Sequence, residues 1–419
     1  MKEIKNNIKL SELRINGDRL WRSLLDMSKI GPGIAGGNNR QALTDEDSKG
    51  RHLFRKWCEE ENMQVYVDQI GTMFAERKGT DPEALPLYIG SHLDTQPTGG
   101  KYDGVLGVLS SLEVIRTLNE NKIETKRPII ITNWTNEEGS RFAPSMLASA
   151  VFAGIYSLEY AYGLKDQDGI TLRHELERTG WLGNEEVGKR KMHSYIEYHI
   201  EQGPILEAKN KSIGVVTHCQ GQSWLEVTLI GRSAHTGSTP MDMRINAGLA
   251  MSRIIDAVDI IAMNNQPKVA GSIGQVKFYP NSRNVLPNKV IFTIDIRAVE
   301  KDKFELMCEL IEKETLKIAK DHNVKCSIER IGHYEPVEFD KKITSTIREV
   351  TKNLNYDFMD IASGAGHDAT WIAQVSPTSM IFCPCVNGVS HNESEEISLE
   401  WAEAGANVLL HSSIEISNK

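Results

Sequence analysis

The chain lacks the features that most quickly assign a protein to a membrane or to the secretory route. It contains no apolar run of about 18 residues or more, which argues against a membrane-spanning helix. Its N-terminal stretch, MKEIKNNIKLSELRING, is polar and charged, and it has no apolar core of the kind that a secretory signal requires. We therefore expect a cytoplasmic protein with no membrane partner.

Cysteine and positive charge are both in short supply. The six cysteines lack zinc-finger spacing, and Cys383 and Cys385 follow an apolar run in which thiols usually pack. Reduced cysteines fit the expected location. The chain has 48 lysines and arginines against 57 aspartates and glutamates, which gives a formal net charge of -9. Because no basic stripe is available to neutralise phosphates, nucleic acid is excluded as the main partner.

The length of 419 residues predicts two domains, because it exceeds what one ordinary core can organise. Segments 1–219 and 333–419 alternate buried strands with helices, and together they predict one discontinuous domain. Within it, the apolar strands Leu87–His92 and Pro128–Trp134 flank the apolar helix Val105–Leu118. This alternation is typical of an α/β fold with a mostly parallel central sheet flanked by helices.

The pattern changes near residue 220. From there to residue 332 the elements follow the order strand-helix-strand-strand-helix-strand, which is typical of a ferredoxin-like α+β domain. We expect this segment, 220–332, to be inserted into the first domain. The expected strands cover 223–231, 270–279, 290–297 and 324–330, and the expected helices cover 244–263 and 302–320.

Histidine and aspartate follow the first buried strand in the motif GSHLDT. His92 and Asp94 are two residues apart at a strand end, so both project to one face. Asp94 can then accept the second N–H of a metal-bound imidazole. Asp103, in the motif GGKYDG, stands at the start of the apolar helix and can present a carboxylate to a cation. Capping of that helix is an equally good interpretation of Asp103 on its own.

Two adjacent glutamates, Glu137 and Glu138, follow the strand that ends at Trp134. Neighbouring residues of an extended segment point to opposite sides, so one can bind a metal while the other faces the substrate water. An exposed acidic loop is the commoner fate of such a pair. His199 lies in a strand-like stretch and His391 in a Gly-Val-Ser-His loop, although a lone histidine is more often a satisfied core residue.

Together these motifs place three imidazoles and two or three carboxylates at the ends of apolar strands. That ligand set suits Zn²⁺ or a similar divalent ion. In open α/β sheets, binding sites lie outside the carboxyl ends of the strands, where these motifs fall. The sequence therefore predicts a metal centre at this edge of the sheet.

The motif order resembles that of the M20-type metallo-amidase family over nearly the whole chain. The motifs are SHLDT, GGKYDG, NEEGSRF, HIEQGP, AHTGSTPM, SGAGHD and VSHN. Within that family they look like the branch that contains N-carbamoyl-L-amino acid hydrolases, β-ureidopropionase of the yeast type and allantoate amidohydrolase. One departure follows the last motif, where Glu393 stands in place of the proline that the family pattern favours.

The resemblance implies two divalent metal ions per subunit. Zn²⁺ is the expected ion, with Mn²⁺, Co²⁺ and Ni²⁺ as alternatives that the same ligands accept. Bridged ions of this kind lie roughly 3.5–4 Å apart. Glu137 would be the general base, with Asp94 as a further catalytic residue. One ion would be bound by His92 and His199, the other by Glu138 and His391, and both would be bridged by Asp103.

The resemblance also implies that the inserted domain is a lid and a dimerisation domain, so that the protein is a homodimer. His235, in AHTG, would be a catalytic residue that stabilises the oxyanion across the dimer. Arg297 would grip the substrate carboxylate with its planar guanidinium. Without the resemblance, a loop histidine and a strand-end surface arginine would be the better interpretations of these two residues. The remaining residues that would bind substrate are Gln202, Asn284, Gly366 and His367.

The segments QPTGGKYD, NWTNE and QSW look closest to the β-ureidopropionase and carbamoylase members of the branch. We predict hydrolysis of the ureido C–N bond of an N-carbamoyl-L-amino acid or of N-carbamoyl-β-alanine to the amino acid, CO₂ and ammonia. Allantoate amidohydrolase is the alternative within the same chemistry. A non-catalytic relative that binds ureido compounds or amino acids is the alternative from another class, and it has no need for the carboxylate of Glu137.

Overall fold

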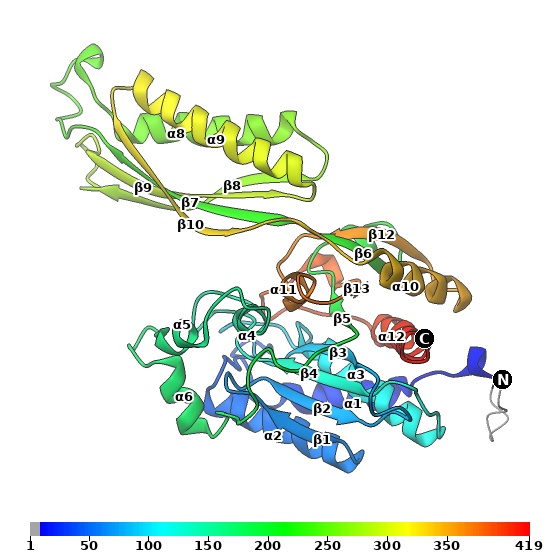
Figure 1. Ribbon diagram of the computed structural model, residues 1–419. Coiled ribbons are helices and arrows are strands. Elements are labelled where there is room, and N and C mark those ends of the chain that lie inside the picture. The colour runs from blue at the N-terminus through cyan, green and yellow to red at the C-terminus, as the bar shows by residue number, and fades with distance from the viewer. Residues whose placement is uncertain (1–8) are drawn as a thin grey trace. The chain divides into compact units, whose positions relative to one another are not determined.

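The computed structural model describes residues 9–419, which divide into two compact units (Figure 1). The first unit runs to Thr217 and resumes over Phe339–Lys419, and the second comprises His218–Glu338. The inserted unit extends past residue 332, because its last long strand continues to Tyr334. Its two ends pair with each other in antiparallel fashion.

The first unit is built on a mixed sheet whose central strands are parallel (Figure 1). Its strands are β1 (Gln64–Val67), β2 (Met73–Arg77), β3 (Leu87–His92), β4 (Ile129–Trp134), β5 (Ser194–Ile200), β6 (Ile213–Cys219), β12 (Phe358–Ser363) and β13 (Thr378–Cys383). The order is β1-β2-β4-β3-β5-β13-β6-β11, where β11 is the short strand Val337–Glu338, and β12 also pairs with β6. The parallel strands β4, β3, β5 and β13 are buried along their whole length, as a sheet covered on both faces requires. The predicted α/β fold is confirmed.

Helices pack against the buried strands. Both α3 (Val105–Glu120) and α12 (Leu399–Ser417) contact β3 and β5, and α11 (Asp368–Ile372) contacts β5 and β13. Gly107 lets α3 approach closely, because a Cβ there would lie 2.2 Å from the carbonyl oxygen of Tyr198. The other helices of this unit are α1 (Gly17–Ser28), α2 (Asp45–Glu60), α4 (Leu147–Phe152), α5 (Leu158–Gly163), α6 (Leu172–Thr179), α7 (Ile205–Ala208) and α10 (Lys341–Asn353).

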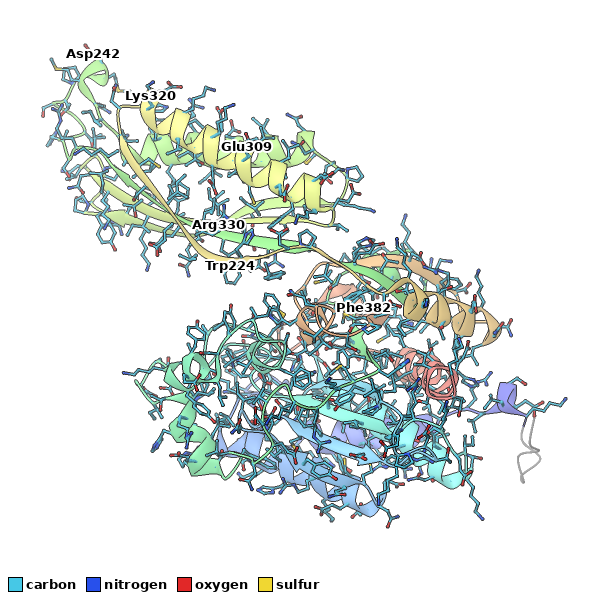
Figure 2. The ribbon with its side chains drawn as sticks, in the orientation of Figure 1. Trp224, Asp242, Glu309, Lys320, Arg330 and Phe382 are labelled. Carbon is cyan, nitrogen blue, oxygen red and sulfur yellow. The ribbon has the colours of Figure 1, made fainter. Side chains whose placement is uncertain are left out.

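The second unit has the order of elements that its sequence predicts. Its elements are β7 (Gly221–Ile230), α8 (Ala247–Asn264), β8 (Val269–Tyr279), β9 (Lys289–Ala298), α9 (Lys301–Asp321) and β10 (Lys325–Tyr334). The strands form a separate antiparallel sheet in the ferredoxin-like order β10-β7-β9-β8. Alternate residues such as Leu225 and Ile294 belong to the core shared with α8 and α9, whereas Trp224 lies on the opposite face of the sheet (Figure 2).

Within residues 9–419, no helix combines the length and the apolar character needed to cross a membrane. The same range contains all six cysteines, and each is a free thiol. Cys383 and Cys385 are buried at the end of β13 and just after it, where they pack as small apolar side chains.

Candidate metal centre

The candidate centre lies at the carboxyl ends of the parallel strands. His92 is the last residue of β3, His199 lies near the end of β5, and Glu137 and Glu138 follow β4. His391 lies in the loop after β13. Because parallel strands bring their carboxyl ends to one edge of a sheet, residues far apart in the sequence meet there. All five belong to the first unit.

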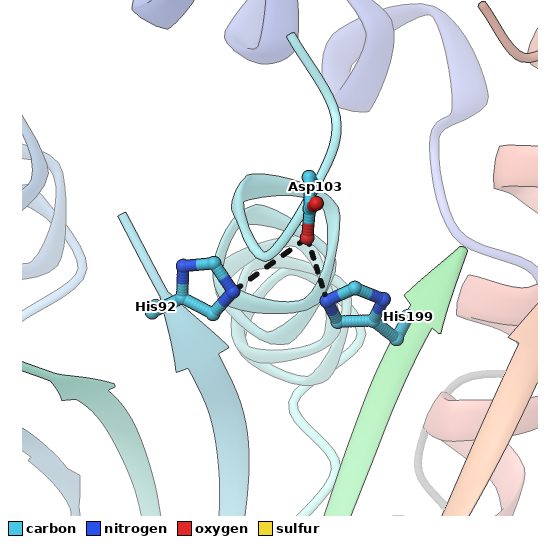
Figure 3. Close-up of side chains that lie close together, drawn as sticks. All are labelled: His92, Asp103 and His199. Carbon is cyan, nitrogen blue, oxygen red and sulfur yellow. Dashed lines mark ion pairs between the residues drawn. The ribbon is translucent and has the colours of Figure 1, made fainter. Parts of the chain in front are cut away.

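Asp103 occupies the middle of this group. Its Oδ1 lies 3.1 Å from Nε2 of His199 and 3.7 Å from Nε2 of His92 (Figure 3). Its Oδ2 lies 3.4 Å from Nε2 of His391. Asp103 does not cap α3, because the N-cap position is Gly104 and no side chain caps the helix. The two oxygens of one carboxylate therefore face different histidines.

Two groups of ligand atoms form around this carboxylate. One contains His92, Asp103 and His199, and the other contains Asp103, Glu138 and His391; in each group the ligand atoms lie within 4.8 Å of one another. Nε2 of His391 is 3.4 Å from Oε2 of Glu138. Imidazole nitrogen and carboxylate oxygen are donors that Zn²⁺ and similar divalent ions accept. The residues thus fit two neighbouring ions with Asp103 between them.

A third group of possible ligands shares His199 with the first group, but its carboxylate is already hydrogen-bonded to protein groups. It contains Glu197, His199 and His367. The carboxylate of Glu197 already accepts the hydroxyl of Ser91 at 2.7 Å and the backbone N–H of Ala369 at 2.9 Å. Glu197 therefore joins β3, β5 and α11 beneath the centre, where its hydrogen bonds support the strand ends.

Backbone carbonyls orient the first two imidazoles. Nδ1 of His92 lies 2.9 Å from the carbonyl oxygen of Asp94, and Nδ1 of His199 lies 2.9 Å from that of Ile200. These contacts place a proton on each Nδ1 and turn each Nε2 toward Asp103, where it can bind a cation or, in a protonated imidazole, donate to the carboxylate. The carboxylate of Asp94, expected from the sequence in this role, instead accepts the backbone N–H groups of Glu137 and Glu138 at 3.3 and 3.2 Å.

The carboxylate of Asp103 attracts positive charge from both sides. Burial opposes its ionisation, but hydrogen bonds with His199 and His391 hold the pKa of Asp103 well below its usual range. Burial lowers the pKa of His199, yet the hydrogen bond with Asp103 raises it to about 9. The bond with Asp103 also raises the pKa of His391 to about 9. The third histidine differs, because burial lowers the pKa of His92 to about 4 and keeps its imidazole neutral, the form that binds metal.

Glu137 lies beside the first ligand group. Its side chain is 7% exposed, and its Oε2 lies 3.4 Å from Nε2 of His92. Burial, followed by the negative charge of Asp368, raises the pKa of Glu137 well above its usual range. Glu138 points to the other group, and its carboxylate accepts the side-chain amide of Gln96 at 2.7 Å. Adjacent glutamates therefore serve different parts of the centre.

Three residues predicted to bind substrate surround these ligands. Nε2 of Gln202 donates to Oδ2 of Asp103 at 2.8 Å. The ring of His367 packs edge-on against His199 with 4.5 Å between centroids, and Gly366 precedes it at the start of α11. Gln202 and His391 both have positive φ, at 57° and 52°, which is uncommon outside glycine and tends to occur at functional sites.

The other three predicted residues belong to the inserted unit. Nδ1 of His235 accepts the backbone N–H groups of Gly237 and Ser238 at 3.0 and 3.2 Å. That leaves the proton on Nε2, so the side chain presents a hydrogen-bond donor. Asn284 is adjacent, since its carbonyl accepts the N–H of Thr236 at 3.0 Å. The structure thus brings His235 and Asn284 together.

Arg297 lies on β9 of the same unit. Its guanidinium pairs with Asp295 at 3.0 Å, and its strand position is directly opposite Gln222 on β7. Gln222 and Trp224 share the sheet face of Arg297, because residues two apart on a strand point the same way. This places the guanidinium on the face opposite the helices.

The sequence did not reveal two buried acids that support the centre. Glu395 is 4% exposed and accepts the backbone N–H groups of Tyr102 and Asp103. Glu197 is a charged residue within the buried strand β5, two positions before His199. A glutamate within an apolar strand indicates a buried carboxylate with specific partners, because a buried charge is costly without them. Glu395 lies in a loop with other glutamates, and nothing in the local sequence distinguishes it from an exposed acid.

Comparisons with known proteins give relatives of nearly the same length. An N-carbamoyl-L-amino-acid amidohydrolase from Rhizobium meliloti is 64% identical over 402 residues, covering 96% of this chain and 97% of the relative. An N-carbamoyl-L-amino acid amidohydrolase from Geobacillus stearothermophilus is 34% identical, covering 95% of this chain and 98% of the relative.

A solved structure and a family pattern agree with these relatives. The crystal structure of an amidase of the hydantoinase/carbamoylase family from Burkholderia multivorans is 48% identical, with a TM-score of 0.93. The match covers 97% of this chain and 99% of that one. The sequence pattern of peptidase family M20/M25/M40 matches residues 88–414. From this match and from the full-length relatives, the chain belongs to peptidase family M20/M25/M40.

Proposed function

We propose that this protein is a metal-dependent amidohydrolase that cleaves the ureido C–N bond of N-carbamoyl-L-amino acids, or of N-carbamoyl-β-alanine. Water enters the reaction, and the amino acid, CO₂ and ammonia leave. The observation that carries the proposal is the carboxylate of Asp103, whose two oxygens face separate ligand groups next to Glu137. The relative that is 64% identical bears the name of this activity.

Two divalent ions per subunit are part of the proposal. When bound, such ions polarise the scissile carbonyl and lower the pKa of water. Zn²⁺ is the expected ion, and the nitrogen and oxygen donors also accept Mn²⁺, Co²⁺ and Ni²⁺. The first ion would be held by His92 and His199, the second by Glu138 and His391, and Asp103 would contact both.

Glu137 is the general base in this proposal. Its carboxylate lies beside His92 yet is absent from both ligand groups, so it is available for proton transfer. It would take a proton from the attacking water and deliver it to the leaving nitrogen. Asp94 would keep Glu137 and Glu138 in place through their backbone N–H groups. A protein that only binds ureido compounds has no use for the carboxylate of Glu137.

Substrate recognition falls to polar residues around the centre and in the inserted unit. Arg297 would bind the substrate carboxylate in bidentate fashion. The Nε2–H of His235 would donate to the oxygen that gains negative charge, with Asn284 beside it. Gln202, Gly366 and His367 would line the pocket near the ligands.

A homodimer is expected, with the inserted unit as its interface. Among the described strands, β8 pairs only with β9, so one of its edges remains available for pairing. Helix α8 of the same unit exposes Leu249, Ile260 and Met263. Apolar side chains next to a strand edge are typical of an interface between subunits.

The direct test is an assay of purified, metal-loaded protein against three substrate types. These are a series of N-carbamoyl-L-amino acids, N-carbamoyl-β-alanine and allantoate. We expect release of the amino acid and ammonia from the carbamoyl compounds and no reaction with allantoate. Turnover of allantoate alone would overturn the substrate assignment. Ligand binding without any turnover would favour a non-catalytic relative.

A further inference from the structure

The loop that follows His391 places the buried carboxylate of Glu395 against the backbone of Asp103. Oε1 of Glu395 accepts the backbone N–H groups of Tyr102 and Asp103, each at 3.0 Å. Oε2 of Glu395 accepts the hydroxyl of Ser390 at 2.9 Å. One carboxylate therefore joins the segment that carries Asp103 to the segment that carries His391, although 292 residues separate Glu395 from Asp103.

Ser390 extends this connection to the carboxylate of Asp103. Its hydroxyl oxygen lies 3.2 Å from Oδ2 of Asp103 as well as 2.9 Å from Glu395. Nε2 of Gln202 donates to the same Oδ2 at 2.8 Å. The oxygen of Asp103 that faces His391 is thus surrounded by polar groups, and one of them is oriented by Glu395.

The glycine-rich segment before Asp103 is shaped around this carboxylate. A Cβ at Gly100 would lie 2.0 Å from Cδ of Glu395, so a larger residue there would displace the Glu395 carboxylate from this position. The side chain of Glu395 is buried where it accepts the backbone N–H of Asp103. A buried acid beside a second carboxylate is costly unless cations lie nearby.

We propose that Glu395 is a positioning residue for the pair of metal ions. It fixes the backbone N–H of Asp103 and orients Ser390, so that the two oxygens of Asp103 point to opposite ligand groups. Glu395 acts through these contacts and does not bind the ions. The inference rests on the proposed function, because it requires that the two ligand groups hold metal.

The test measures metal affinity, in protein stripped by a chelator and titrated with Zn²⁺ against a chelating indicator. Wild type is expected to bind two equivalents. Glu395→Ala is expected to lose affinity for at least one ion by about 10- to 100-fold, a usual cost of removing a group that supports ligands. Glu395→Gln keeps an oxygen for both backbone N–H groups and should stay within about threefold of wild type.

Glu393→Ala is the matched control. Its carboxylate belongs to the same loop and accepts backbone N–H groups, those of Ile34 and Gly37 among them, but it touches no ligand. This variant should bind both ions as wild type does. If Glu395→Ala folds poorly in the absence of metal, Ser390→Ala removes the link to Oδ2 of Asp103 and should also weaken binding.

Three results have distinct meanings. Wild-type affinity for both ions in Glu395→Ala or Ser390→Ala would overturn the inference and leave the proposed function intact. Equal losses in Glu395→Gln and Glu395→Ala would overturn positioning through hydrogen bonds. A wild-type protein that binds no divalent ion would instead overturn the proposed function itself.

Discussion

The carboxylate of Asp94 accepts the backbone N–H of Glu138 at 3.2 Å, while the carbonyl of the same aspartate lies 2.9 Å from Nδ1 of His92. One residue thus serves two segments of the centre by two different groups. Its side chain fixes the paired glutamates, and its backbone orients the first histidine. A substitution that changes only the side chain separates these two roles.

Asp94→Asn should therefore lower kcat while the protein keeps its metal. An amide offers one acceptor oxygen in place of two, so either Glu137 or Glu138 loses its backbone contact. We expect a fall in kcat of about 10- to 100-fold, with KM nearly unchanged. Metal analysis of the same preparation should give the wild-type content. Loss of the metal would show that the Asp94 carboxylate is needed to hold the ligands, through Glu138 or His92, and would contradict a role confined to the chemical step.

Arg297→Lys should weaken substrate binding without slowing the chemical step. Lysine cannot form the bidentate contact with a carboxylate, which is worth about 2 kcal/mol, or roughly 30-fold in KM. Steady-state kinetics with an N-carbamoyl-L-amino acid measure the change. Arg330→Lys, on β10 of the same unit, is the control and should behave as wild type. An equal rise in KM for a substrate amide that lacks the carboxylate would contradict the assignment.

Gly405→Ala should destabilise the first unit. A Cβ at this position of α12 would lie 2.2 Å from Cζ of Tyr198, whose buried hydroxyl donates to the carbonyl of Trp401. Overpacking of this kind costs about 1–3 kcal/mol, which urea unfolding can measure. Gly163→Ala in α5 meets no atom within 4 Å and is the control, with an expected change of about 0.5 kcal/mol or less. Equal midpoints for the two variants would contradict this packing.

Mixed dimers test whether His235 works in the neighbouring subunit. Glu137→Gln and His235→Ala homodimers should each be nearly inactive, because one lacks the base and the other the donor. In a mixed dimer, one of the two sites would combine an intact Glu137 with an intact His235. We expect such dimers, separated by tags, to recover up to about half of the wild-type activity per dimer. Proven heterodimers without recovery would place His235 in its own subunit's site.

Much of the fold could be predicted from the sequence, because buried strands require apolar residues close together in the chain. The strands Leu87–His92 and Ile129–Trp134 begin with apolar runs and are buried along their whole length, which requires a sheet covered on both faces. No strand was predicted at Ile213–Cys219. That segment, IGVVTHC, mixes glycine and polar residues with a short apolar core, so its place in the sheet is decided by its contacts with β13.

The ligands were easier to predict than the residues that support them. His92 and Glu138 stand where apolar strands end, so their positions along the chain already indicate the edge of the sheet. The contact of Glu395 with Asp103 joins residues that are 292 positions apart, and no local pattern reveals it. The contact of His92 with the carbonyl of Asp94 depends on backbone geometry, which residue types alone do not specify.

The most direct test is a crystal structure of the Glu137→Gln variant grown with Zn²⁺, with data collected on both sides of the zinc absorption edge. Two anomalous peaks are predicted roughly 3.5–4 Å apart, one on each side of the Asp103 carboxylate. The same preparation should show no turnover. A single peak, or peaks away from Asp103, would contradict the two-metal centre.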